Sequence, residues 1–214
     1  MGVQKSAHRP QTFSLRSEGH PLILPVYYDF ASTLCYVAHR VMQRLEPQLG
    51  ELDIALEWRP LDLSLLTGWR RGAAFDAERR QNARQIAAEL GVEVRMPTRW
   101  LDSRAAHAVA LALIDTNKEP TWRERVWSAV FEEGRDIGEA GEVERIATDI
   151  GLTVTVVDLD RPDRLDADTH AARAIGVTGV PTFLLGEWPM GGIQDDQTML
   201  GVLRRFRARR TNED

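Results

Sequence analysis

The sequence predicts an α/β fold in which a long helical block interrupts a sheet-forming domain. Two observations support this prediction. Short apolar segments rich in β-branched and aromatic residues occur near both ends of the chain, at residues 22–30, 52–60 and 179–193. Between them, residues 63–150 repeat apolar side chains at the three- and four-residue spacing of amphipathic helices. These observations predict one α/β domain that is interrupted by an all-α insertion.

The first unit is predicted to be a strand, a helix and a second strand. Residues 22–30 are apolar and too short for a helix, which is typical of a buried strand. Ser32 then stands where a helix N-cap belongs, and apolar residues recur at helical spacing up to Gly50. Residues 52–60 alternate apolar and polar side chains, the period of a half-buried strand.

The middle of the chain is predicted to be helical over residues 76–90, 103–117, 120–133 and 142–150. Gly91 and Gly151 follow two of these segments, as helix C-terminal stops do. The block also contains four tryptophans, Trp69, Trp100, Trp122 and Trp127. Tryptophans in helical segments are more often core residues than cofactor contacts. Residues 153–157 fit either a short strand or an extended link.

The last part of the chain returns to β character. A helix is expected over residues 166–175, followed by strands at 179–186 and 188–193 and a final helix at 196–207. The first twenty residues are polar, which predicts a disordered N-terminal segment over residues 1–20. The element boundaries predict a sheet domain formed by residues 21–62 and 165–214, and a helical insertion domain over residues 63–164.

The composition argues against several classes of function. The 214 residues carry 27 basic and 32 acidic side chains, a net charge of −5, so no basic surface for nucleic acid is expected. No segment reaches the roughly 20 apolar residues that span a bilayer, and we expect a cytoplasmic protein without membrane contact. The single cysteine, Cys35, excludes an intramolecular disulfide. The histidines lack the spacing of metal ligands, so no metal is expected.

The turn from the first strand into the first helix is the most informative motif. It places Ser32 and Cys35 in an S-x-x-C arrangement at a helix N-terminus, where backbone N–H groups stabilise negative charge. A thiolate at such a position has a lowered pKa. The competing interpretation is that Ser32 only caps the helix and Cys35 is a small buried apolar residue.

A second motif, Gly-Val-Thr-Gly-Val-Pro-Thr-Phe, occupies residues 176–183. Together with the S-x-x-C turn, it resembles the DsbA-like branch of the thioredoxin superfamily. This branch includes FrnE-type dithiol oxidoreductases, 2-hydroxychromene-2-carboxylate isomerases and kappa-class glutathione transferases. The resemblance extends through the segments at residues 57–61, 131–137 and 192–195. It implies a thioredoxin-like fold, βαβ followed by αββα, interrupted by the helical insertion.

The resemblance also implies roles for individual residues. Val180 and Pro181 correspond to the family's cis-proline pair, whose backbone aligns an extended peptide such as glutathione. Ser32 stands where oxidoreductases carry the attacking cysteine and Cys35 where they carry the resolving one; a serine hydroxyl cannot replace the attacking thiolate. In the isomerase and kappa transferase relatives, a serine here donates a hydrogen bond to the glutathione sulfur. Asp195 resembles either the residue that pairs with the glutathione ammonium or a helix cap.

The leading hypothesis is therefore a glutathione-dependent isomerase or transferase in which Ser32 stabilises the thiolate of glutathione. Its hydrophobic acceptor is expected between the two domains, in a pocket lined by Tyr36, Trp69 and Trp100. The alternatives are a thiol–disulfide oxidoreductase acting through Cys35 and a binding module without catalysis. The expected ligand is a small-molecule or peptide thiol. Because relatives are often dimers, both a homodimer and a monomer are considered.

Overall fold

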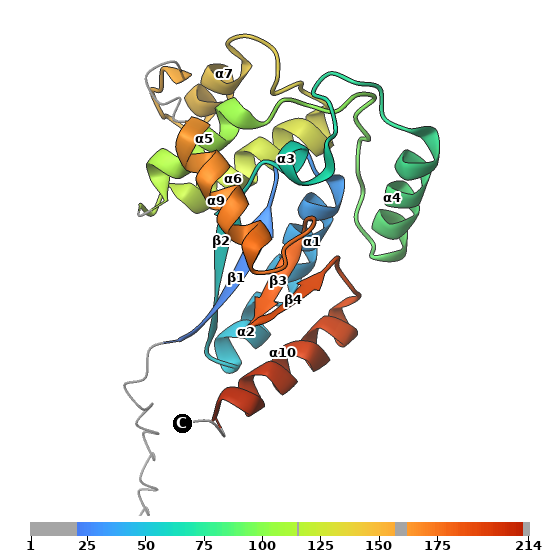
Figure 1. Cartoon of the computed structure of the whole chain (residues 1–214), viewed down its shortest axis with the longest axis vertical. Coiled ribbons are helices and arrows are strands. Elements are labelled where there is room, and N and C mark those ends of the chain that lie inside the picture. The colour runs from blue at the N-terminus through green and yellow to red at the C-terminus, as the bar shows by residue number, and fades with distance from the viewer. Residues whose placement is uncertain (1–20, 115, 157–161, 212–214) are drawn as a thin grey trace, which may run out of the picture.

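A four-stranded mixed sheet forms the base of the molecule (Figure 1). The computed structural model describes residues 21–114, 116–156 and 162–211, so the predicted disordered segment over residues 1–20 lies outside the described part. The strands are β1 (Leu22–Tyr28), β2 (Ile54–Pro60), β3 (Thr182–Leu185) and β4 (Trp188–Gly191), in the order β2-β1-β3-β4. β1 runs parallel to β2 and antiparallel to β3, and β3 pairs antiparallel with β4.

The helix after β1 is shorter than predicted. The sequence pattern indicated one helix from Ser32 to Gly50, but the structure has α1 (Thr33–Arg44) and α2 (Glu46–Glu51), separated at Leu45. Pro47 lies in the first turn of α2. A proline lacks the N–H of a helix interior and its ring clashes with the preceding turn, so the first helix ends before it. α1 crosses over to β2 and completes the predicted βαβ unit.

The inserted helices lie at one end of the sheet (Figure 1). They are α3 (Leu63–Thr67), α4 (Ala77–Glu89), α5 (Arg104–Leu113), α6 (Glu119–Ser128), the π-helical turn η1 (Ala129–Glu133) and α7 (Glu142–Asp149). Within α4 only Ala87 is fully buried, and this helix lies against α1 at the edge of the molecule. Residues 153–155 form no strand, so of the two interpretations for this segment they fit the extended link.

Two further helices complete the chain. α9 (Pro162–Ala174) contacts α3, α5 and β2, while α10 (Asp196–Thr211) contacts α1 and lies along the other end of the sheet (Figure 1). The βαβ and αββα halves thus join in one sheet, and the predicted thioredoxin-like α/β fold is confirmed. The division into a sheet domain and an insertion domain stays a prediction. Among the described helices, none is both long and apolar enough to cross a membrane.

An aromatic cluster joins the sheet to the inserted helices. Tyr28 of β1, Trp58 of β2 and Trp127 of α6 meet with ring centroids 5.3 to 5.9 Å apart. Phe30 packs edge-on against Tyr28 at 5.1 Å. Trp127 is fully buried, as is Trp122, whose indole N–H donates to the carbonyl of Ala106. These two tryptophans have the core role that the sequence indicated, and they tie the insertion to the strands that carry the site.

Candidate functional site

Ser32 occupies the N-cap of α1, directly after the turn that follows β1. Its backbone is extended, and its Oγ accepts a hydrogen bond from the N–H of Cys35 at 3.4 Å. The N–H of Ser32 donates to the carbonyl of Asp29 at 3.0 Å, which holds the turn closed. Because Oγ is the acceptor in its cap bond, the O–H proton can still donate to a ligand. Ser32 thus places a hydroxyl donor at the positive end of a helix.

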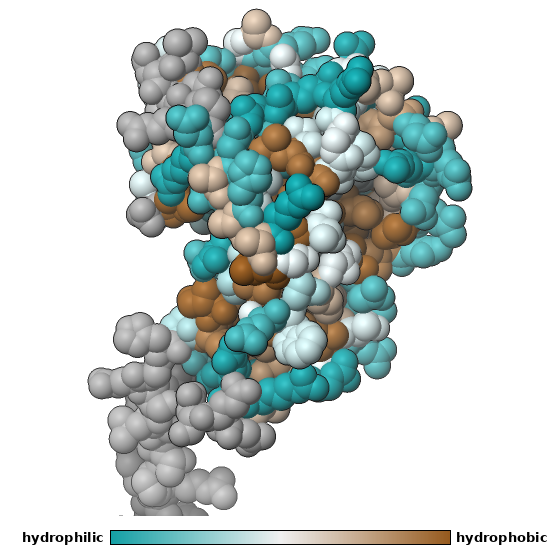
Figure 2. Space-filling model, in the orientation of Figure 1, coloured by the Kyte–Doolittle hydropathy of each residue, from teal (hydrophilic) through white to brown (hydrophobic). Residues whose placement is uncertain are grey.

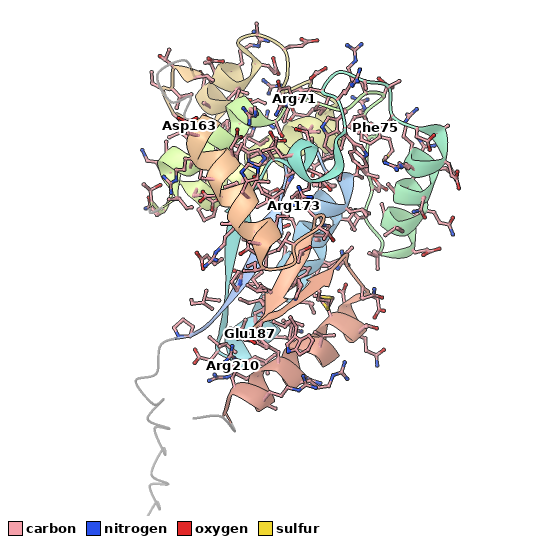
Figure 3. All side chains as sticks on the ribbon, viewed as in Figure 1. Arg71, Phe75, Asp163, Arg173, Glu187 and Arg210 are labelled. Carbon is pink, nitrogen blue, oxygen red and sulfur yellow. The ribbon has the colours of Figure 1, made fainter. Side chains whose placement is uncertain are left out.

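A cavity of about 280 Å³ opens beside Ser32. The start of α1, the segment from α3 to α4, and the loop before β3 form its walls. Its lining residues are Ser32, Thr33, Leu34, Leu63, Trp69, Phe75, Arg79, Asn82, Ala83, Trp100 and Val180. Figure 2 shows apolar residues gathered in a hollow beside α4, and Figure 3 shows Phe75 between α3 and α4. No carboxylate belongs to this lining, and its one cationic side chain is Arg79.

Aromatic rings form the far wall of the cavity. Trp69 lies edge-on to Trp100 with centroids 4.5 Å apart, and Phe75 packs against Trp100 at 5.4 Å. The guanidinium of Arg79 lies 4.9 Å from the ring centroid of Trp69. This wall can bury an apolar or aromatic group beside a cation, while the opposite wall presents the Ser32 hydroxyl.

Four of the predicted site residues meet at this cavity: Ser32, Trp69, Trp100 and Val180. Pro181 follows Val180 directly, and the peptide bond between them is cis. The structure therefore places the start of α1 and the Val180–Pro181 pair around one space, although almost 150 residues separate them in sequence.

The structure does not bring Tyr36 to this cavity, so its predicted role in the substrate pocket is corrected. Its ring stacks on Phe131 with centroids 5.1 Å apart, and its hydroxyl donates to Glu132 Oε1 at 2.8 Å. Phe131 and Glu132 belong to η1, and neither they nor Tyr36 line the Ser32 cavity. Tyr36 therefore fixes the insertion to α1.

Asp195 caps α10. Its carboxylate accepts the N–H of Thr198 at 2.9 Å and the Thr198 hydroxyl at 2.7 Å, and these bonds lower the pKa of Asp195. The neighbouring Asp196 pairs with Arg44 at 2.6 Å, in the last turn of α1 and thus at the opposite end of that helix from Ser32. Of the two interpretations from the sequence, the structure displays the cap, and Asp195 does not line the cavity.

Cys35 is fully buried beneath the first turn of α1. Burial raises the pKa of its thiol to about 12, against smaller lowering effects from the Ser32 side chain and the backbone at Asp29. At neutral pH the sulfur is thus a protonated thiol without solvent access. A thiol in this state is neither a nucleophile nor a metal ligand, because both roles need the thiolate.

The sequence did not point to Asp29, a buried carboxylate in the turn between β1 and Ser32. Asp29 is 1% exposed and accepts three hydrogen bonds: from the N–H of Ala31 at 2.8 Å, the N–H of Leu63 at 2.8 Å and the hydroxyl of Ser103 at 2.6 Å. Its Oδ1 also lies 3.3 Å from Nε2 of the buried His107. Asp29 therefore joins the Ser32 turn to the starts of α3 and α5. An acidic residue closing an apolar strand was the available signal.

Metal ligands form no cluster in the described part of the chain. Within residues 21–114, 116–156 and 162–211, no group of three or more histidine, cysteine or acidic side chains could hold an ion.

A mixed sheet with a helical insertion, and a cis peptide bond between Pro181 and the Val180 that lines the cavity at the start of α1, defines a protein of the thioredoxin superfamily. Residues 23–204 match the model of the DSBA-like thioredoxin domain, and the chain belongs to this family. It is 25% identical to the uncharacterized protein YwbO of Bacillus subtilis over 186 residues, covering 79% of this chain and 89% of that protein.

Two solved structures share the fold. A 2-hydroxychromene-2-carboxylate isomerase superposes with a TM-score of 0.70 at 21% identity, covering 90% of this chain and 98% of the isomerase. The cytosolic disulfide reductase DsbM of Pseudomonas aeruginosa, solved with GSH, gives a TM-score of 0.59 at 20% identity, with 90% and 98% coverage. At these identities the two structures establish a common fold.

Proposed function

We propose that this protein is a glutathione-dependent isomerase or transferase in which the Ser32 hydroxyl stabilises the thiolate of bound glutathione. One observation carries the proposal. The cavity at the N-terminus of α1 presents a hydroxyl donor and no carboxylate, while the chain's single thiol, Cys35, is buried away from solvent. A site arranged in this way suits a nucleophilic sulfur that arrives with the ligand.

Electrostatics favour a thiolate at this position. The N-terminus of α1 and a hydrogen bond from Ser32 each contribute about 1 kcal/mol to the charged form. Together they lower the pKa of a bound thiol by about 1.5, since each pKa unit corresponds to about 1.4 kcal/mol. Arg79, at the same cavity, adds positive charge. Bound glutathione would thus carry a larger thiolate fraction at neutral pH than the free tripeptide does.

Other residues of the site are suited to bind the peptide part of glutathione and the acceptor substrate. Val180, beside Pro181, lines the cavity. Its backbone would align the glutathione peptide, as the family resemblance implies. Trp69, Trp100 and Phe75 offer an apolar wall for the acceptor substrate. Asp195 lies outside the lining of the cavity, so it is a secondary candidate for the γ-glutamyl ammonium, although its carboxylate could accept a further bond beside the two cap bonds. We propose a cytoplasmic location, because glutathione is abundant in that reducing compartment.

The two alternative functions have less support. Disulfide exchange needs an accessible thiolate, whereas Cys35 is buried with a pKa of about 12. A binding module that had lost its chemistry would be favoured if the chain's own side chains filled the space beside Pro181. The cavity there instead retains about 280 Å³.

Calorimetric titration of reduced glutathione tests the proposal, with S-methylglutathione as the ligand that lacks a thiol. Ser32→Ala should weaken the binding of glutathione about fivefold at a pH where the bound thiol is ionised, because one hydrogen bond of about 1 kcal/mol is lost. The same variant should leave S-methylglutathione unaffected. Ser128→Ala, which removes a hydroxyl of α6 that donates to Glu132 of η1, is the matched control.

The pKa of the bound thiol gives a second readout, followed through the ultraviolet absorbance of the thiolate. It should lie below that of free glutathione in the wild type and rise in Ser32→Ala. The proposal fails if the wild type does not bind glutathione at millimolar concentration. It also fails if Ser32→Ala lowers the affinities for glutathione and S-methylglutathione equally, because the hydroxyl would then not act on the sulfur.

A further inference from the structure

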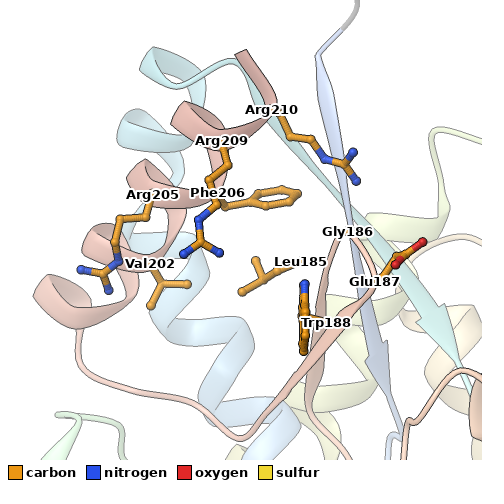
Figure 4. Close-up of a pocket in the computed structure, with 9 residues that line it drawn as sticks. All are labelled: Leu185, Gly186, Glu187, Trp188, Val202, Arg205, Phe206, Arg209 and Arg210. Atoms are coloured by element: carbon orange, nitrogen blue, oxygen red, sulfur yellow. The ribbon is translucent and has the colours of Figure 1, made fainter. Parts of the chain in front are cut away.

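A second cavity, of about 500 Å³, lies between the β3–β4 hairpin and the second half of α10 (Figure 4). The two-residue turn of Gly186 and Glu187 connects the strands, with Gly186 at a φ of +71° that favours glycine. The lining residues are Leu185, Gly186, Glu187, Trp188, Val202, Arg205, Phe206, Arg209 and Arg210. None of them belongs to the cavity at Ser32.

The two cavities lie at opposite ends of the sheet domain. β3 begins at Thr182, next to Pro181, and ends at Leu185, so the hairpin turn is the end of the strand remote from the Ser32 cavity. Figure 3 likewise places Glu187 and Arg210 far from Phe75. A ligand in the second cavity would therefore not touch the proposed glutathione site.

An exposed indole forms one wall of this cavity. Trp188 is 75% exposed, the largest exposed fraction among the bulky apolar residues of the described chain. Figure 4 shows its ring standing across the cavity from Arg205 and Arg209 of α10. Leu185, Val202 and Phe206 supply apolar contacts between the two walls. A flat ring inserted here would stack on the indole and cover these apolar groups.

The charge of the cavity is positive. Three arginines line it against one carboxylate, Glu187. In Figure 4 the Glu187 side chain points away from Arg205 and Arg209. Arginines of the helical insertion such as Arg104 and Arg125 pair with carboxylates, but no carboxylate of the described residues pairs with Arg205 or Arg209. Two exposed guanidinium groups on one helix face are thus available to an anion.

We propose that this cavity binds a small aromatic anion: a planar ring that stacks on Trp188 and a carboxylate, sulfonate or phosphate that pairs with Arg205 and Arg209. The helix places these two arginines one turn apart, on the face that also carries Val202 and Phe206. A small ligand fits better than a nucleic acid, because the cavity holds about 500 Å³ and the whole chain has a net charge of −5.

Binding of 2-naphthoate, measured by calorimetry, tests the proposal, and the neutral 2-naphthamide serves as its uncharged counterpart. The double variant Arg205→Gln/Arg209→Gln should lower the affinity for 2-naphthoate at least about tenfold, because two charge-assisted bonds are lost. Arg204→Gln, at an exposed arginine of α10 outside the cavity, is the matched charge control and should change the affinity less than twofold. Trp188→Ala should weaken binding about fivefold or more, and Trp188→Phe should restore part of the loss.

The Ser32 cavity also has aromatic walls and an arginine, so the two sites must be distinguished. Perturbation of the Trp188 indole resonance, assigned by its absence in Trp188→Phe, reports on the second cavity alone. Binding there should persist in Ser32→Ala and in Arg79→Gln, whatever happens to glutathione. The proposal is overturned if 2-naphthoate leaves this resonance unchanged, if 2-naphthamide binds equally well, or if Arg204→Gln weakens binding as much as the double variant does.

Discussion

Replacing Asp29 by alanine should destabilise the protein strongly, although the residue lies outside the cavity that we assign to glutathione. The substitution removes a carboxylate that accepts three hydrogen bonds, and it leaves the N–H groups of Ala31 and Leu63 and the Ser103 hydroxyl without their acceptor. Hydrogen bonds to a charged group contribute about 1.5 to 3 kcal/mol each but are not additive within one network. A buried donor that loses its acceptor costs about 1 to 3 kcal/mol. We therefore expect the free energy of unfolding to fall by about 4 kcal/mol.

Urea denaturation followed by circular dichroism measures this loss. Ser103→Ala removes one of the three donors and should cost only about 1 kcal/mol. Asp29→Asn keeps one acceptor oxygen but turns an NH₂ group toward a backbone N–H. Its free energy of unfolding should therefore fall by more than that of Ser103→Ala and by less than that of Asp29→Ala. If Asp29→Ala unfolds within about 1 kcal/mol of the wild type, the carboxylate does not hold the Ser32 turn as described. If Asp29→Ala is too unstable to purify, the ordering of Asp29→Asn and Ser103→Ala still tests the reasoning.

Two further predictions concern titratable groups. Cys35 should react with a thiol-specific disulfide reagent at least about a hundredfold more slowly in the native protein at pH 8 than in the guanidinium-unfolded chain, because burial keeps its pKa near 12; fast native labelling would contradict this. The hydrogen bond from His39, at 2.5 Å, lowers the pKa of Glu124 to about 2 from 4.5, so the unfolded chain binds a proton first as the pH falls. Stability should thus decline between pH 4.5 and 2, by about 1 kcal/mol after allowance for solvent screening at a side chain 37% exposed. Urea midpoints across this range should change less in Glu124→Gln.

The elements of the sheet domain could be predicted because each leaves a local signature. The apolar run at residues 22–30 and the alternation at residues 52–60 became β1 and β2, and Ser32 became the cap of α1. The separation of α1 from α2 was also available from Pro47, whose effect on a helix is local. These signals work because strand period, capping and proline geometry depend on neighbours in the sequence.

The far wall of the cavity could not be predicted in the same way. Phe75 and Arg79 reach it because the segment from α3 to α4 folds back against α1, and no local pattern tells where a helix will pack. Tyr36 was misplaced for the same reason: its position one turn after Ser32 does not determine which inserted helix covers that side of α1. The burial of Cys35 likewise follows from tertiary packing and not from the motif that contains it.

The peripheral position of α4 has a consequence for how such a protein can change. The start of α1 and the loop before β3 contribute Ser32 and Val180 to the cavity, whereas α4 contributes Arg79, Asn82 and Ala83 and buries only Ala87. Substitutions on the cavity face of α4 therefore disturb little of the core. In the proposed function, the part of the cavity that holds the thiolate and the part that contacts the acceptor substrate can therefore change independently of each other.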